Sequence, residues 1–382
     1  MFNVNKSKNI LEDLLKNFDP FQYEITRNHI DGSVSLLSPY ITHGILTLPE
    51  IYQFVNSNFN LKSDNKFLKE LAWREFFYHV WKFKKNQIFK AIQKDFKTEK
   101  YITTELPSDI VNASTGLNLI DNIVKQLYEH GYLHNHARMW LASYIVHFRK
   151  IDWRLGADWL YSHLLDGDLA SNHLSWQWIA GSFSKKPYLF NAENVSKYGP
   201  KNWNCDDTFL DDSYQNLHEF AVSSKKVDGG ISLQEIEPKL YCYPPENLLT
   251  ATSENLKQVR IIHPWNIRIG LCEKKNINKN VGVFFEEFHT KWPWSKKRWS
   301  FVMDNMKSIC DEIYWCEKSL IINGSCFEEN LHLDFVLENK SNKLFTEMRP
   351  NIWSTDINYC QSFSKFWKTV NKKTNNQYKL FF

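Results

Sequence analysis

The sequence predicts an α plus α/β fold, in which an all-α domain is followed by a small α/β layer at the C-terminus. Two observations predict it. Apolar residues recur at i, i+3 and i+4 over most of residues 10–200, as in buried helices. From about residue 256 the chain changes to short runs of β-branched and aromatic residues. We therefore expect a helical domain at 1–200, a connecting region at 201–255 and a small α/β domain at 256–382.

The helices are predicted from individual segments of the first part. These segments are LEDLLKNF (11–18), FLKELAWREFFYHVWKF (67–83), GLNLIDNIVKQLYEH (116–130), NHARMWLASYIVHF (135–148) and DWLYSHLL (158–165). The breakers DGS, LPSD, STG and DGD mark loops between them. In the connecting region, SYQNLHEFAV (213–222) predicts one further helix.

The α/β layer is predicted from four runs that are typical of strands. They are VRIIHPWNI (259–267), NVGVFFEEF (280–288), SLIING (319–324) and HLDFVLE (332–338). KKRWSFVMDNMKSICDEIYWC (296–316) predicts one long amphipathic helix between strands. Strand, helix and strand in this order indicate a βαβ unit.

Composition excludes several classes of protein. With 382 residues, 43% of them hydrophobic and 24% charged, the chain is neither disordered nor fibrous. No apolar run approaches the roughly 20 residues of a membrane span, and the N-terminus has no signal-peptide core, so we expect a cytoplasmic protein. All seven Cys lie at or after Cys205 without a CxxC pair, and we predict no metal. The net charge of +4 is too small to indicate nucleic acid by itself. No GxGxxG or GxxxxGK[ST] loop is present.

One predicted helix carries an unusual set of residues on one face. Glu70, Trp73, Arg74 and Phe77 are spaced i, i+3, i+4 and i+7. Arg suits an anionic partner, because its planar fork binds phosphate through two hydrogen bonds. The alternative is a core helix with one buried salt bridge.

Two further segments place polar residues among aromatic ones. Asn135, Arg138 and Met139 share one face, and Asp168, Asn172 and Trp176 are spaced i, i+4 and i+8. Asp166 lies just before the second helix, where an acid is also a plausible cap. Buried polar groups need partners, so these residues either satisfy one another or bind a large polar ligand.

Taken together, the motifs resemble the FAD-binding half of DNA photolyases and cryptochromes. The motifs are SVSLLSPYITHGILT (33–47), FLKELAWREFFYH (67–79), GYLHNHARM (131–139), IDWR (151–154) and LLDGDLASNHLSWQW (164–178). The resemblance covers roughly residues 20–195 and follows the family's order. It implies a photolyase-type helical domain that binds FAD without a Gly-rich loop.

The resemblance implies a set of cofactor-binding residues. These are Tyr23, Val34, Ser35, Leu36, Leu37, Ser38, Arg74, Asn135, Arg138, Asp166, Gly167, Asp168 and Asn172. Residues 35–38 would hold the phosphates, Arg138 and Asp166 would pair beside the flavin ring, and Asn172 would face N5. Val34 and Leu36 stand where the family often has Thr and Arg, so one hydroxyl donor is missing.

The resemblance also implies a pocket for a cyclobutane pyrimidine dimer (CPD) flipped out of UV-damaged DNA. Its residues are Glu70, Trp73, Asn135, Met139 and Trp178. Trp rings replace lost base stacking, and a carboxyl and an amide bind base edges. The (6-4) branch carries His where Asn135 stands, and we interpret the flanking His134 and His136 as structural.

The implied reaction is light-driven electron transfer from reduced FAD, which splits the dimer. Trp176 and Trp153 match the first two members of the Trp relay that reduces the flavin. The third has no clear match; either Trp159, Trp140 or a nearby Tyr takes its place, or the relay ends early. Two other functions stay open, a cryptochrome-like photoreceptor without repair and a redox flavoprotein with weak DNA affinity.

The domain order departs from the family, because only about twenty residues precede Tyr23 and the α/β pattern follows the helices. We expect a shrunken antenna-like layer in swapped order, and this leaves an antenna chromophore in doubt. WPWSKKRWSF (292–301) either touches DNA or, as we favour, begins a helix with a packed underside. We expect no long polar signalling tail after residue 382, and we expect a monomer.

Overall fold

The structure, a computed structural model, describes residues 13, 18–62, 64–93, 104–184, 186–268, 277, 279–317, 325–334, 345–353 and 357–378. The chain divides into two units, each assembled from segments that are distant in sequence. We call residues 19–34 and 83–238 the helical unit, and residues 1–18, 35–82 and 239–382 the sheet unit. This division differs from the consecutive ranges that we expected, because residues 35–82 belong with the C-terminal part.

The helical unit contains all four of the helices predicted at 116–130, 135–148, 158–165 and 213–222. Its helices are α2 (Pro20–Thr26), η1 (Lys85–Phe89), α6 (Ser108–Val111), α7 (Asn118–His130), α8 (Asn135–Ser143), η3 (Tyr144–Phe148), α9 (Trp153–His163), α10 (Leu169–Ala180), α11 (Ala192–Tyr198), η4 (Lys201–Trp203) and α12 (Tyr214–Val222). The segment predicted at 135–148 changes from α- to π-helix at Tyr144. A glycine with positive φ ends α7 at Gly131 and α10 at Gly181, as helix C-termini favour.

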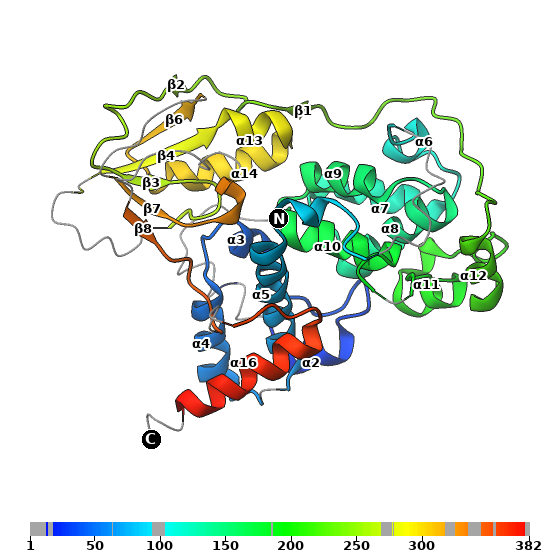
Figure 1. Ribbon diagram of the computed structural model, residues 1–382. Coiled ribbons are helices and arrows are strands. Elements are labelled where there is room, and N and C mark those ends of the chain that lie inside the picture. The colour runs from blue at the N-terminus through cyan, green and yellow to red at the C-terminus, as the bar shows by residue number, and fades with distance from the viewer. Residues whose placement is uncertain are drawn as a thin grey trace. The chain divides into compact units, whose positions relative to one another are not determined.

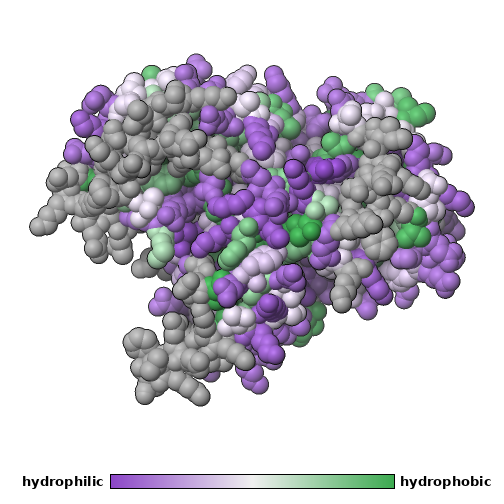
Figure 2. Space-filling view, in the orientation of Figure 1, coloured by the Kyte–Doolittle hydropathy of each residue, from purple (hydrophilic) through white to green (hydrophobic). Residues whose placement is uncertain are grey.

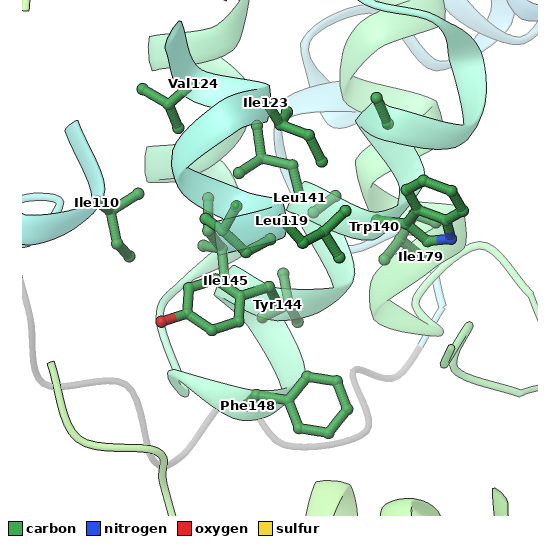
Figure 3. Close-up of a cluster of buried hydrophobic side chains, with 14 of the residues drawn as sticks. Ile110, Leu119, Ile123, Val124, Trp140, Leu141, Tyr144, Ile145, Phe148 and Ile179 are labelled. Carbon is green, nitrogen blue, oxygen red and sulfur yellow. The ribbon is translucent and has the colours of Figure 1, made fainter. Parts of the chain in front are cut away.

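The core of this unit is formed by the apolar faces of α6, α7, α8, η3 and α10 (Figure 3). Ile123 of α7, Leu141 of α8 and Ile145 of η3 are fully buried there. Along each helix, the buried apolar residues recur at i, i+3 and i+4, so the periodicity of the sequence predicts the helix.

The sheet unit combines helices α3 (Ser38–Thr42), α4 (Leu48–Phe59) and α5 (Lys66–Lys84) with the C-terminal α/β layer (Figure 1). Its six-stranded sheet is wholly parallel, in the order β2-β6-β4-β3-β7-β8. The strands are β2 (Leu249–Thr250), β3 (Arg260–Ile262), β4 (Asn280–Phe285), β6 (Glu312–Cys316), β7 (Cys326–Glu328) and β8 (Phe345–Glu347). The predicted α plus α/β fold class is therefore confirmed.

The remaining elements of the sheet unit are a second, two-stranded sheet and the helices around the strands. They are β1 (Leu240–Tyr241) and β5 (Trp294–Ser295), which pair antiparallel, α13 (Glu286–Lys291), α14 (Lys296–Lys307), η5 (Leu331–Leu333) and α16 (Phe363–Tyr378). A Cβ on Gly282 of β4 would lie 2.8 Å from the Met306 side chain, so glycine lets α14 pack closely on the sheet.

Several predictions for the α/β layer need correction. The single helix predicted at 296–316 is wrong, because α14 ends at Lys307 and Glu312–Cys316 forms β6, which pairs with β4. The strand predicted at 332–338 begins instead in η5. The strand predicted at 319–324 and most of the helix predicted at 11–18 lie outside the described residues.

The WPWSKKRWSF segment is packed, as we favoured. Trp292, Trp294 and Trp299 are buried, and the guanidinium of the buried Arg298 lies 4.2 Å from the centre of the Trp294 ring.

The face of the molecule shown in Figure 2 is mostly hydrophilic, with hydrophobic colour in small separate areas. Among the described residues, no helix is long and apolar enough to cross a membrane.

Candidate cofactor and base-binding site

Helix α8 carries the best-defined part of the predicted cofactor site. The predicted ion pair is present, because Arg138 Nη2 donates to Asp166 Oδ1 at 3.0 Å and to Oδ2 at 2.8 Å. Arg138 Nε donates to the Leu133 carbonyl at 2.9 Å, which fixes the plane of the guanidinium. The Asp166 side chain is 5% exposed and that of Arg138 is 24% exposed, so the pair is shielded from water on the carboxylate side.

The N-terminus of α10 is capped by Asp168, whose Oδ1 accepts from the Ser171 N–H at 2.8 Å. Asp166, which we considered as a cap, instead pairs with Arg138. One turn into α10, Asn172 Nδ2 donates to the Ala157 carbonyl of α9 at 2.8 Å. This hydrogen bond fixes the direction of the Asn172 amide, while Gly167 N–H donates to the Leu164 carbonyl in the preceding turn.

The predicted base-binding residues of α8 lie on the same helix as Arg138. Asn135 is exposed, and its Nδ2 lies 3.5 Å from Met139 Sδ, one turn along. On α10, Trp178 is 39% exposed and its ring centre is 5.7 Å from that of Tyr188. An amide, a thioether and an indole are thus accessible in the helical unit.

The histidines that flank Asn135 have structural contacts. His134 caps α8 by accepting from the His136 N–H, and the His136 ring packs 5.2 Å from the Tyr198 ring. Burial lowers the pKa of both imidazoles to about 4, so both are neutral at pH 7.

The Trp residues assigned to the electron relay are buried. Trp176 lies against Gly156 of α9, where a Cβ would come within 2.3 Å of the indole. Trp153 is 6.4 Å from the ring of His173, which follows Asn172. Of the alternatives for a third member, Trp159 donates to the Tyr128 hydroxyl and Trp140 donates to Asn194, and both are buried. Neither therefore offers an exposed end.

In the sheet unit, the predicted face of α5 is only half-buried. Glu70, Trp73, Arg74 and Phe77 all have intermediate exposure. Arg74 Nη2 donates to the Thr42 hydroxyl of α3. Trp73 stacks on Phe363 of α16, with 4.0 Å between ring centres and 8° between ring planes.

The buried acid of α5 is Glu75, which the prediction missed. Its carboxylate accepts from the Ile352 N–H at 2.5 Å and from the Trp353 N–H at 3.2 Å. Burial raises the pKa of Glu75 to about 7, although both hydrogen bonds and Arg349 lower it. Its position within the apolar stripe of Leu71, Phe76 and Leu68 was the available signal, because an acid there needs buried donors.

The predicted phosphate loop has the backbone shape that binds an anion. Leu36 has a φ of +52°, and Leu37 follows with φ −80° and ψ −14°. Such alternation turns successive N–H groups toward one side, as in an anion-binding nest, and a positive φ in leucine is strained. Leu36, Leu37 and Ser38 therefore fit a phosphate group.

The other predicted cofactor residues divide between the two units. Tyr23, in α2, and Val34 belong to the helical unit, whereas Ser35 and Arg74 belong to the sheet unit. No group of three or more His, Cys, Asp or Glu side chains suited to a metal occurs within the described part of the chain.

The sheet unit also contains a small pocket. Its lining includes Trp265, Arg268, Glu328 and Arg349, which follow or end the strands β3, β7 and β8. Arg268 pairs with Glu328, whose pKa is raised by burial. Since the chain order of the strands reverses between β3 and β7, this pocket lies where parallel sheets commonly bind ligands.

Comparison with known proteins identifies the helical region. A family model described as the FAD binding domain of DNA photolyase matches residues 67–212. A deoxyribodipyrimidine photo-lyase of Agrobacterium fabrum is 33% identical over 185 residues, which is 44% of this chain and 36% of that protein. Another, of Buchnera aphidicola, is 30% identical over 277 residues, which is 58% of this chain and 56% of that protein. The matched part thus spans about half the length of these relatives or less.

Two solved structures are also similar. A Synechocystis cryptochrome is 28% identical, with a TM-score of 0.45 over 51% of this chain and 43% of that chain. A class III photolyase from Agrobacterium tumefaciens is 24% identical, with a TM-score of 0.45 over 57% of this chain and 54% of that chain. The family model and the curated relatives support the assignment of the matched region to the DNA photolyase/cryptochrome family.

Proposed function

We propose that this protein repairs cyclobutane pyrimidine dimers in DNA with blue light and reduced FAD. The observation that carries the proposal is the arrangement of α8. Its Asn135–Met139 pair, suited to a base edge and an apolar ring, lies on the same helix as the Arg138–Asp166 pair, suited to a flavin. The relatives named deoxyribodipyrimidine photo-lyase support it. UV-damaged DNA is the proposed partner and a monomer the proposed acting form.

We propose two sets of contacts for the cofactor. The N–H groups of Leu36, Leu37 and Ser38 suit its phosphates, and the Arg138–Asp166 pair suits the polar edge of its ring. Reduced FAD supplies the light-driven electron when it is bound. Asn172 keeps a fixed amide direction through the Ala157 carbonyl, so it would present the same polar atoms to N5 in every turnover.

The substrate would be held by a carboxyl, an amide and apolar side chains. Glu70 and Asn135 bind base edges, and Met139 contacts the fused rings. Trp178, which is 39% exposed, supplies an aromatic face without rearrangement. Trp176 and Trp153 are proposed to carry electrons to the resting flavin, since both indoles are buried away from water.

The test is repair of an oligonucleotide that contains one thymine dimer. Purified protein with quantified reduced FAD is illuminated with blue light, and a dark sample is the control. We expect light-dependent loss of the dimer. Intact dimer after illumination, despite bound reduced FAD, contradicts the proposal.

A cryptochrome-like photoreceptor without repair is the second candidate. The observation that favours it is the Phe363 ring stacked on Trp73, because this face would be needed for a base. It predicts light-dependent change of the flavin spectrum with no loss of dimer in the same experiment.

A further inference from the structure

Helix α16 lies beside α5 (Figure 1). Its Phe363 covers one face of the half-buried Trp73 of α5. The Phe363 and Trp73 rings are 4.0 Å apart at their centres and nearly parallel, at 8°. The remaining surroundings of Trp73 are also aromatic, with the Phe77 ring at 5.4 Å and the Phe76 ring at 5.6 Å. A nucleobase has no room between rings at this separation, so the covered face of Trp73 cannot stack on a base while Phe363 stays.

The position of α16 follows from its apolar stripe. Phe363, Phe366, Trp367 and Val370 are spaced i, i+3, i+4 and i+7, so they form one face of the helix. Phe366 is 3% exposed and packs 5.6 Å from Phe76, and Trp367 packs 5.3 Å from Trp353. Phe363 is the half-buried first residue of the helix, whereas Phe366 and Val370 are buried.

The segment that leads into α16 is anchored on α5. Glu75 accepts two backbone N–H groups, from Ile352 and Trp353, and His79 Nε2 accepts the Cys360 N–H at 3.0 Å. Burial lowers the pKa of His79 to about 4, so this imidazole is neutral and can accept at pH 7. These hydrogen bonds hold the start of α16 near Trp73, whereas Phe363 itself contacts Trp73 through aromatic stacking.

We propose that Phe363 is a residue of the base-binding site. Its ring occupies the stacking face of Trp73 and must move away before a flipped base can stack there. This inference rests on the proposed function, because that function makes Trp73 a base-stacking residue. Phe363 thereby selects for bases that are already unstacked in DNA, since only these compete with an aromatic ring held in place. A base that is already stacked in undamaged DNA gains too little stacking free energy on Trp73 to displace the Phe363 ring.

The experiment compares matched variants in binding to an oligonucleotide with one thymine dimer and to the same sequence undamaged. Phe363→Leu keeps apolar volume against Phe76 but cannot stack on Trp73. Phe366→Leu is the control, because it makes the same change on α16 at a ring that contacts Phe76 and His79. Thermal unfolding of each variant confirms that it folds.

We expect Phe363→Leu to bind the dimer-containing oligonucleotide about threefold to tenfold more tightly, as the loss of a competing ring stack predicts. Its preference for damaged over undamaged DNA should fall. Phe366→Leu should stay within about twofold of wild type. In wild type, the backbone amides of 364–370 should exchange hydrogen faster when the damaged oligonucleotide is added.

Two results overturn the inference and are distinguishable from each other. If wild type repairs the dimer but Phe363→Leu binds no more tightly than wild type or Phe366→Leu, the role of Phe363 is wrong and the proposed function stands. If neither wild type nor Phe363→Leu repairs the dimer or prefers damaged DNA, both fail.

Discussion

Glu75 makes the stability of the sheet unit fall as pH rises, and Glu75→Gln should remove this dependence. Burial raises the pKa of this carboxyl from 4.5 to about 7. One pKa unit corresponds to about 1.4 kcal/mol, so ionising Glu75 costs about 3 kcal/mol more in the folded protein than in the unfolded chain. The folded state holds more protons than the unfolded state between these two pKa values. Glu75 therefore favours folding most below pH 4.5, and this stabilisation is lost as pH rises to about 7.

The assay is urea unfolding of wild type and Glu75→Gln at pH 5, 6, 7 and 8. The free energy of unfolding of wild type should fall relative to the variant by about 2.5 kcal/mol over this range, because part of the effect is already lost at pH 5. Taking the difference between the two proteins cancels the opposite effect of His79, His134 and His136, whose lowered pKa values cost stability as pH falls below about 6.5. Glu129→Gln, at a side chain that is 72% exposed, is the control. A constant difference between wild type and Glu75→Gln across pH refutes the reasoning.

Three further predictions concern the proposed site. Gly156→Ala forces the Trp176 ring to shift, because the new Cβ would lie 2.3 Å from it. We expect the free energy of unfolding, measured with urea, to fall by about 1–3 kcal/mol. We also expect slower flavin photoreduction, measured by absorbance under blue light. Asp166→Asn leaves the Arg138 guanidinium without its carboxylate, and weaker FAD binding should appear in fluorescence titration; unchanged affinity contradicts a cofactor role for the pair. Glu70→Ala should lower the repair yield while FAD stays bound, and loss of FAD would move Glu70 from substrate to cofactor binding.

The longer helices of the helical unit, such as α7, α8 and α9, were predicted from the sequence. These helices exceed two turns and bury one face, so their periodicity is visible in the sequence alone, whereas the short α2, α6 and α11 were not predicted. The Arg138–Asp166 pair came from motif resemblance, and the structure contains it. The assignment of these residues to FAD and DNA stays a prediction.

The α/β layer was predicted less well. The segment 308–316 has apolar residues that suit helix or strand, and periodicity cannot separate the two in so short a run. Pairing of Glu312–Cys316 with β4 made it a strand. The membership of residues 35–82 in the sheet unit also depends on contacts between distant segments, such as His43 Nδ1 with the Pro264 carbonyl at 2.6 Å.

The sequence by itself determined the fold class, the resemblance to the photolyase/cryptochrome family and the polar residues set among aromatic helices, because each of these follows from local spacing and motif order. Only the tertiary structure decided that Glu75 rather than Glu70 is the buried acid of α5, and that Phe363 covers Trp73. The physical reason is that burial and stacking depend on which distant segment packs against a helix. Ile352 lies 277 positions from Glu75 along the chain, and no local pattern of the sequence encodes a contact over such a separation.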